Sequence, residues 1–461
     1  MTNTRKERAL GLLEKYQLSK RLLRAYGNVC YTAELEHPHR SEDAAQFYLT
    51  RLKFALQTLI TKHASLSLII RDKDKSTVHF EQLECIDLAK VVTVSSEKTT
   101  LDSLIQEQCT IEFDLDSQAP LWRLKIVPTS PTRCFASLTV HHTMGDGMSL
   151  YIFWKELLEG LKTNAEDKEQ GSLIYIPDNL KVYLPFESCS PPAISIFSDV
   201  LPAVAKSYAT KLLPGLIANA LSDNDWRGDF PAVDGEPHST EVMTNKIEKS
   251  QWEAILKEAK RHQVSGHAIL YALFVLAWAT LYNDFSVSVE TPVNCRRLCN
   301  PPVPQNQMGN FVGAHKCHWK KEYLSQILEK REIWVMAKEY HDKLQNGKEK
   351  AARQSLLLKY LATFPASYSE YWQDKRQNPM KREGGLELSD VGKLDCYGDE
   401  WKLVSLYFCQ SANTFSTAFG MNSVCLNNEL HYTVGWQKGS VDQDKILEFN
   451  RVFNELIQSL Q

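Results

Sequence analysis

A histidine pair between a strand pattern and a helix pattern constrains this chain more than any other feature. The stretch Val140-His141-His142-Thr143-Met144-Gly145-Asp146-Gly147 follows an extended apolar run that starts at Cys134, and it precedes a helix-like run over 149–158. It therefore predicts a strand that ends at a histidine pair, a turn through two glycines, and a helix. From the rigid end of a sheet, a histidine of ordinary pKa can accept a proton from a hydroxyl or amine that attacks a carbonyl. An isolated histidine here would more often be a structural residue, but the complete motif in this position favours catalysis.

The length of the chain, 461 residues, exceeds what one compact core usually contains, so we expect two domains. Prolines at 185, 191, 192, 202, 214, 231 and 237 interrupt the middle of the chain. Such interruptions are typical of a connection between domains. We therefore expect a first domain over 1–185, a crossover linker over 186–240 and a second domain over 241–461.

The composition is that of an ordinary globular protein, with 43% hydrophobic and 24% charged residues. A net charge of −3 gives no reason to expect nucleic acid as a partner. The eleven cysteines form no Cys-x-x-Cys pair, and the chain opens with polar residues instead of a signal sequence. No window has the length of apolar sequence that a membrane span needs. We expect a cytoplasmic monomer, and leave open peripheral contact with the endoplasmic reticulum or lipid droplets.

Further motifs lie at ordered intervals on both sides of the histidine pair. Phe113-Asp114-Leu115 and Pro120-Leu121-Trp122-Arg123 precede it, and Pro292-Val293-Asn294-Cys295-Arg296, Gly309-Asn310-Phe311-Val312-Gly313 and the stretch 384–392 follow it. Together with His-His-x-x-x-Asp-Gly, this series resembles the fungal alcohol O-acetyltransferase branch of the chloramphenicol-acetyltransferase-like, or condensation-domain, superfamily. The resemblance covers roughly 27–460. Two positions depart from it: Asn294 stands where an Asp is usual, and Asp390 where an Asn is usual.

The resemblance implies an α/β fold of two chloramphenicol-acetyltransferase-like domains, each an open mixed sheet with flanking helices, and an active-site tunnel between them. It implies that His142 is the general base and that Asp146 is a structural residue that pairs with Arg296. Ser389 is the candidate hydroxyl for stabilising the oxyanion, although it is equally well explained as a turn residue. Candidate substrate-binding residues are His141, Gly147 and Asn310. Acetyl-CoA would be a cosubstrate, with no bound cofactor and no metal.

The resemblance implies that the acceptor is an alcohol, and the residues around the motif indicate that this alcohol is hydrophobic or amphipathic. The stretch 193–221 is apolar, Tyr151, Phe153 and Trp154 follow the motif, and no charged cluster is evident near it. Two alternatives stay open. An amphipathic amine such as a sphingoid base could be N-acetylated by the same base, and a non-catalytic binding module could have kept the fold.

Other chemistries fit the sequence poorly. Cys295, Cys299, Cys317, His315 and His318 lack the spacing of a common zinc site. There is no Gly-x-Ser-x-Gly motif of a serine hydrolase. No phosphate-binding loop or dinucleotide-binding glycine pattern is present either.

Overall fold

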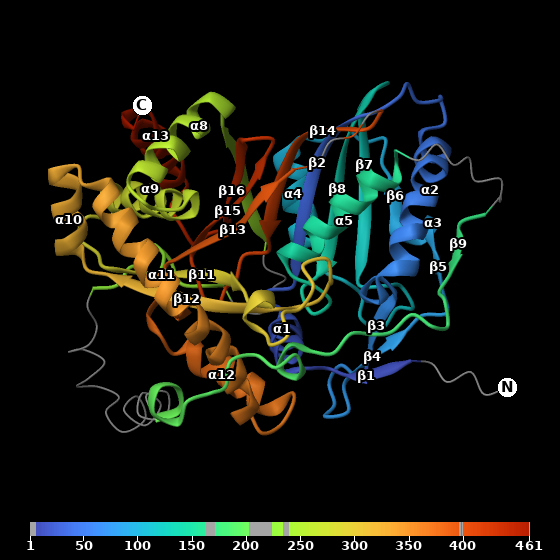
Figure 1. Ribbon diagram of the computed structural model, residues 1–461, viewed down its shortest axis with the longest axis horizontal. Coiled ribbons are helices and arrows are strands. Elements are labelled where there is room, and N and C mark those ends of the chain that lie inside the picture. The colour runs from blue at the N-terminus through green and yellow to red at the C-terminus, as the bar shows by residue number, and fades with distance from the viewer. Residues whose placement is uncertain are drawn as a thin grey trace.

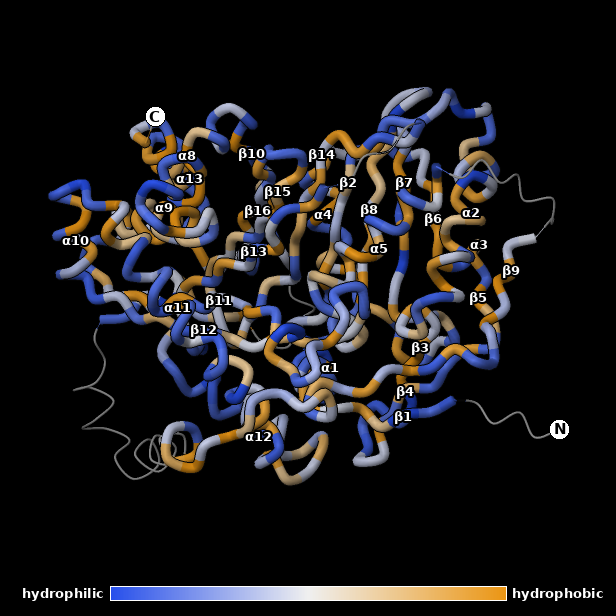
Figure 2. Tube along the Cα trace, in the orientation of Figure 1, coloured by the Kyte–Doolittle hydropathy of each residue, from blue (hydrophilic) through white to orange (hydrophobic). Residues whose placement is uncertain are grey.

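The computed structural model describes residues 6–162, 171–201, 224–233, 239–395, 398 and 400–460. Two open sheets lie beside each other, and each has helices packed against it (Figure 1). Orange, hydrophobic segments run through the interior of both halves, whereas blue segments lie mostly at the periphery (Figure 2). This arrangement confirms the predicted α/β class with two open mixed sheets.

The first sheet has five strands and carries the histidine pair at the end of its central strand. Its order is β14 (Lys402–Gln410), β2 (Asn28–Glu36), β8 (Arg133–His141), β7 (Trp122–Ser130) and β6 (Val92–Val94). Helices α2 (Ala44–Lys62) and α5 (Gly147–Gly160) pack against each other beside this sheet. Helix α4 (Leu101–Thr110) contacts β2 and β8, and α3 (Leu88–Val91) contacts β6 and β7. Two small sheets flank it, formed by β1 (Glu7–Ala9), β4 (His79–Gln82) and β3 (Leu68–Arg71), and by β5 (Cys85–Asp87) and β9 (Leu173–Tyr175).

The second sheet has six strands and two distinct faces. Its order is β10 (Thr240–Ile247), β16 (Glu429–Gln437), β15 (Phe419–Leu426), β13 (Leu386–Leu394), β11 (Val287–Asn294) and β12 (Val312–Trp319). Its apolar side chains, such as Val289, Leu386 and Met421, join one core cluster with α9 (Gly266–Leu281). The surrounding helices are α8 (Lys249–Arg261), α10 (Lys321–Lys330), α11 (Ile333–Leu356) and α13 (Gln443–Ser459). Because side chains alternate along a strand, Glu290 and Glu387 are on the opposite face, toward the first half.

Strand β14 is an exception to a division of the chain at 186–240. It follows β13 in the sequence but pairs with β2 of the first sheet, in antiparallel register from Gln410 opposite Val29 to Lys402 opposite Glu36. It also lies against β15 and β16 of the second sheet. In addition, α1 (Leu12–Leu22) packs against α12 (Ala366–Arg376), so the N-terminal helix also contacts the second half of the chain (Figure 1).

Helix α9 is apolar on nearly all sides and is buried along most of its length. Helix α8 begins at Lys249, and Glu248 is its N-cap residue. Within the described residues, no single helix has both the length and the apolar character to cross a membrane. Helices α8 and α9 meet those two conditions only as a pair, with a bend of 106° between them.

Candidate active site

The end of β8 presents His142 at the place where the two halves meet. The backbone nitrogen of His142 donates to the carbonyl oxygen of Gly27 at 2.8 Å. Its carbonyl oxygen accepts a hydrogen bond at 3.1 Å from the Nδ2 of Asn310, which belongs to the second half. The backbone of this histidine is therefore held from both sides. The residue is 8% exposed, and no described residue forms a hydrogen bond with its Nδ1 atom.

The surroundings of His142 favour the neutral imidazole. Burial lowers its pKa from the usual value near 6.5 to about 4, and the positive charge of Lys20 adds to this effect. The carbonyl groups of His142 and Gly145 and the charge of Asp146 oppose it only in part. The ring is consequently unprotonated at neutral pH and free to accept a proton.

The neighbouring His141 points into the first half. It is completely buried, and its ring packs edge to face on Phe113 with 6.0 Å between ring centroids. Its Nδ1 accepts a hydrogen bond from the backbone nitrogen of Thr143 at 3.2 Å. Burial lowers its pKa to about 3. His141, a candidate substrate-binding residue in the sequence, thus contacts the protein interior.

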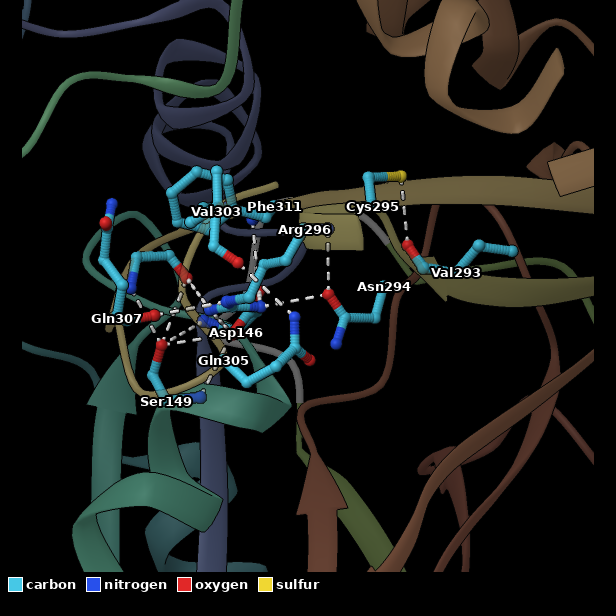
Figure 3. Close-up of polar contacts among 12 residues, drawn as sticks. Asp146, Ser149, Val293, Asn294, Cys295, Arg296, Val303, Gln305, Gln307 and Phe311 are labelled. Atoms are coloured by element: carbon cyan, nitrogen blue, oxygen red, sulfur yellow. Dashed lines mark hydrogen bonds and ion pairs between the residues drawn. The ribbon is translucent and has the colours of Figure 1, made fainter. Parts of the chain in front are cut away.

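Asp146 and Arg296 form a bidentate ion pair that joins the two halves (Figure 3). The Nη1 of Arg296 is 2.7 Å from Oδ2 of Asp146, and Nη2 is 2.9 Å from Oδ1. The remaining donors of Arg296 reach the carbonyl oxygens of Gln307 and Gly309 and the Oδ1 of Asn294. Both members of the pair are buried, with 0% and 1% side-chain exposure. Asn294, which stands where an Asp is usual, therefore acts as a hydrogen-bond acceptor for the arginine.

The loop that follows Arg296 holds the active-site turn. The backbone nitrogen of Phe311 donates to Asp146 at 3.1 Å, and the Oγ of Ser149 accepts from the backbone nitrogen of Gly309 at 3.0 Å. Asp146 also caps helix α5 by accepting from the backbone nitrogen of Ser149. Burial alone would raise the pKa of Asp146, but Arg296 outweighs it, and the net pKa is lowered. The aspartate is thus a charged connector between turn and loop.

The other predicted site residues lie around this connection. Gly147 is the first residue of α5, and a Cβ atom there would come within 2.8 Å of a methyl group of Val391 on β13. The strand that carries Ser389 therefore passes close beside the turn. Ser389 is buried on one side of β13, just before the strand register shifts between Asp390 and Lys393. Asp390 is on the other side, where it accepts a hydrogen bond from Ser423 and contacts His267.

Two expectations about the acceptor surroundings are wrong. Phe153 and Trp154 are completely buried in the core of the first half, so they cannot line an acceptor site. A charged cluster does lie near the motif, although the sequence suggested none. It includes Lys20 and Glu387. The Nζ of Lys20 lies over the ring of Tyr26, and the centroid of this ring is 5.5 Å from the centroid of the His142 ring.

This cluster could not be recognised from local sequence because its members come from distant elements. The one available signal was the alternation of Leu386, Glu387, Leu388 and Ser389, which predicts a strand with one polar face. The apolar stretch 193–221 lies largely outside the described residues. The cysteines and histidines considered for zinc are divided: His315 and Cys317 contact each other, whereas His318 pairs with Asp225.

The chain is similar to several known proteins. The alcohol acetyltransferase family matches residues 95–457. A probable alcohol acetyltransferase, crmB of Aspergillus fumigatus, is 25% identical over 328 residues, which are 66% of this chain and 66% of crmB. The nonribosomal peptide synthetase kk1B of Curvularia clavata is 23% identical over 272 residues, 58% of this chain but 2% of the synthetase.

Solved structures extend the likeness to the whole fold. The TRI3 trichothecene 15-O-acetyltransferase from Fusarium sporotrichioides superposes with a TM-score of 0.70 at 13% identity, covering 100% of this chain and 96% of that one. The condensation domain of the Monacolin K polyketide synthase MokA gives 0.59 at 10% identity, with 99% and 98% covered. At these identities the likeness concerns the fold, and it confirms the predicted condensation-domain-like architecture. Since the family match spans well over half of its length, the chain belongs to the alcohol acetyltransferase family.

Proposed function

We propose that this acyltransferase moves the acetyl group of acetyl-CoA to the hydroxyl group of a hydrophobic alcohol, with His142 as the general base. The observation that carries the proposal is the neutral imidazole of His142, held at the junction by Gly27 and Asn310. Membership of the alcohol acetyltransferase family supports an acyltransferase, and the motif supplies the base. The ring of Tyr26 borders the histidine, with 5.5 Å between ring centroids, and is positioned to contact the body of the acceptor.

In the proposed reaction, His142 accepts the hydroxyl proton while the alcohol oxygen attacks the thioester carbonyl. The carbonyl oxygen becomes an oxyanion, and its collapse breaks the carbon–sulfur bond. The CoA thiolate then takes the proton from the imidazolium, so the enzyme returns to its starting state without an acyl-enzyme. The charge of Asp146 favours the transient imidazolium. We assign Ser389 as the candidate donor to the oxyanion, because its strand passes beside the turn.

The remaining residues have supporting roles in this proposal. Asp146 and Arg296 hold the turn and the loop together, and Asn310 fixes the backbone of His142. Gly147 keeps α5 close to β13, since a larger residue would meet Val391. Acetyl-CoA acts as a cosubstrate in this scheme.

The test is release of CoA thiol from acetyl-CoA in the presence of linear alcohols and matched linear amines. We expect release with alcohols that rises with chain length, because each buried methylene contributes about 0.8 kcal/mol. The His142→Ala variant serves as the control and should lose the release. Transfer to long amines alone would replace the proposal with N-acetylation. Absence of transfer to every acceptor would favour a binding module instead.

A further inference from the structure

A group of buried and half-buried polar side chains lies next to His142 and takes up no proton in the acetyl transfer proposed above. We call Lys20, Tyr26, Glu387 and Gln410 the Lys20 cluster. The Tyr26 ring links it to the motif: its centroid is 5.5 Å from the centroid of the His142 ring and 4.6 Å from the Nζ of Lys20. Because the ammonium and the imidazole contact the same ring, they can be no further apart than these two distances together. One small molecule can therefore reach both.

The ammonium group of Lys20 is buried without a hydrogen-bond acceptor. The residue is 4% exposed, and its Nζ lies over the rings of Tyr16, Tyr26 and Trp372 at 4.5, 4.6 and 5.5 Å from their centroids. Within the described parts of the chain, no oxygen accepts a hydrogen bond from it. Burial lowers its pKa to about 8, so it stays charged at neutral pH. The three ring faces offset part of the cost of burying this charge, but the three N–H donors of the ammonium still have no oxygen acceptor, which a ligand could supply.

Glu387 provides the matching acceptor. Its Oε1 accepts a hydrogen bond from the Nε2 of Gln410, whose own Oε1 accepts from the hydroxyl of Tyr26 at 2.6 Å. Glu387 stands directly beside Glu290 in the parallel pairing of β13 and β11. Burial raises the pKa of Glu387 to about 7, and the charge of Glu290 raises it further than the hydrogen bond from Gln410 lowers it.

The other charges around the Lys20 cluster are already paired. Lys316 lies opposite Glu290 in the pairing of β11 and β12 and contacts it at 3.1 Å. Lys316 also contacts Glu383 at 2.7 Å, and Lys375 forms an ion pair with the same Glu383. The charges of Lys316 and Lys375 therefore neutralise those of Glu290 and Glu383. Among the charged groups that the described residues place around the cluster, Lys20 and Glu387 have no such ion pair; Lys20 can only donate, and Glu387 can accept.

We propose that Lys20 and Glu387 form a polar subsite that binds a second hydroxyl group of the acceptor. This inference rests on the proposed function, in which the acceptor is an alcohol. The ammonium of Lys20 donates to the oxygen of the second hydroxyl, and that hydroxyl donates its proton in a hydrogen bond to Glu387. A hydrocarbon chain would leave Lys20 without an acceptor. A carboxylate would suit Lys20 but would meet the charges of Glu387 and Glu290. The preferred acceptor is thus amphipathic, with an apolar body against the rings and a hydroxyl group at the subsite.

The experiment compares linear primary alcohols with α,ω-diols of the same carbon number, as kcat/KM for acetyl transfer by the full-length enzyme. For the wild type, we expect the ratio of diol to alcohol to peak at one chain length, the one that spans His142 to Lys20. The variant Lys20→Met should lower kcat/KM for that diol roughly 10- to 100-fold, as expected for the loss of a charged hydrogen bond. The readout is the ratio of diol to alcohol, because the charge of Lys20 also lowers the pKa of His142 and its loss should change kcat/KM for both substrates alike.

Matched variants separate recognition from folding. Lys15→Met changes a lysine on a different face of the same helix, so the diol ratio should stay at the wild-type value. Glu387→Gln keeps the size of the side chain and provides a second reading if Lys20→Met lowers the melting temperature. It should also reduce the diol ratio.

The outcomes distinguish this inference from the proposed function. If the wild type acetylates no hydroxyl compound at all, the proposed function fails. If it acetylates simple alcohols but the diol ratio is flat, or unchanged in both variants, the subsite is disproved and the function stands. A higher kcat/KM for hydroxy acids than for diols would overturn the assignment of a neutral hydroxyl.

Discussion

At the scale of single residues, the two histidines of the motif show how one strand end serves two environments. Consecutive residues of a strand point to opposite sides, so His141 enters the core of the first half while His142 reaches the junction. His141 is packed on Phe113, and His142 is beside Tyr26. The same sequence pair therefore combines an anchor with a group that can accept a proton.

Replacing His142 by Ala should leave the protein folded and reduce acetyl transfer by about 10²–10⁴, the usual contribution of a positioned general base. Replacing His141 by Ala should lower the melting temperature through loss of packing, with a smaller change in kcat. Steady-state kinetics and thermal unfolding of both variants provide the measurement. A larger kinetic loss in folded His141→Ala than in His142→Ala would reverse the assignment.

The strand, turn and helix around the histidine pair could be predicted from the sequence because the chemistry and the local structure of the motif lie within eight consecutive residues. The Lys20 cluster could not be predicted in the same way. Lys20 comes from the first helix and Glu387 from a strand of the second sheet, and only the tertiary fold brings them to Tyr26. Phe153 and Trp154 illustrate the opposite error. They follow the motif in the sequence and were therefore predicted to lie at the site, but in the fold they pack in the core.

At the scale of elements, the connection between the turn after β8 and the loop after Arg296 links the two halves at the motif. Asp146 contributes to this link in two ways, as the N-cap of α5 and as the partner of Arg296. Resemblance to a family, and not periodicity, predicted that these two residues pair. The hydrogen bonds from Phe311 and Gly309 that complete the link could be seen only in three dimensions.

The substitution Asp146→Asn should separate the two roles of this residue. Asparagine also caps helices well, so the cap should survive, whereas the buried charge of Arg296 would lose its partner. Breaking a buried ion pair from one side typically costs roughly 3–5 kcal/mol. We therefore expect a clear drop in melting temperature together with slower transfer. Asp43→Asn, at the exposed N-cap of α2, is the control and should change neither. An unchanged melting temperature for Asp146→Asn would rule out the structural role.

At the scale of the whole molecule, several imidazoles are buried in their neutral form. Burial is the main reason that the pKa of His141 falls to about 3 and those of His142 and His431 to about 4. In the unfolded chain these groups would take up protons near pH 6.5, but in the folded protein only near pH 4. Their contribution to stability is complete above pH 6.5 and is lost progressively as the pH falls toward 4.

This difference predicts a marked sensitivity to mild acid. At pH 5 each buried histidine should have lost about 2 kcal/mol of its contribution relative to neutral pH. Denaturant unfolding at pH 7 and pH 5 measures the effect. The His431→Gln variant, which is distant from the motif in sequence, should show a smaller loss between the two pH values than the wild type. Equal losses in the two proteins would show that His431 does not contribute.

The partner of β2 at the edge of the first sheet has a consequence for how the chain is made. Until the ribosome has translated β14 and released it from the exit tunnel, β2 has an open edge, although every other strand of its sheet emerged long before. An uncovered edge can pair with strands of other nascent chains. The edge of β2 therefore stays exposed while most of the second half is synthesised. During that interval, we expect correct folding of the first half to depend on chaperones.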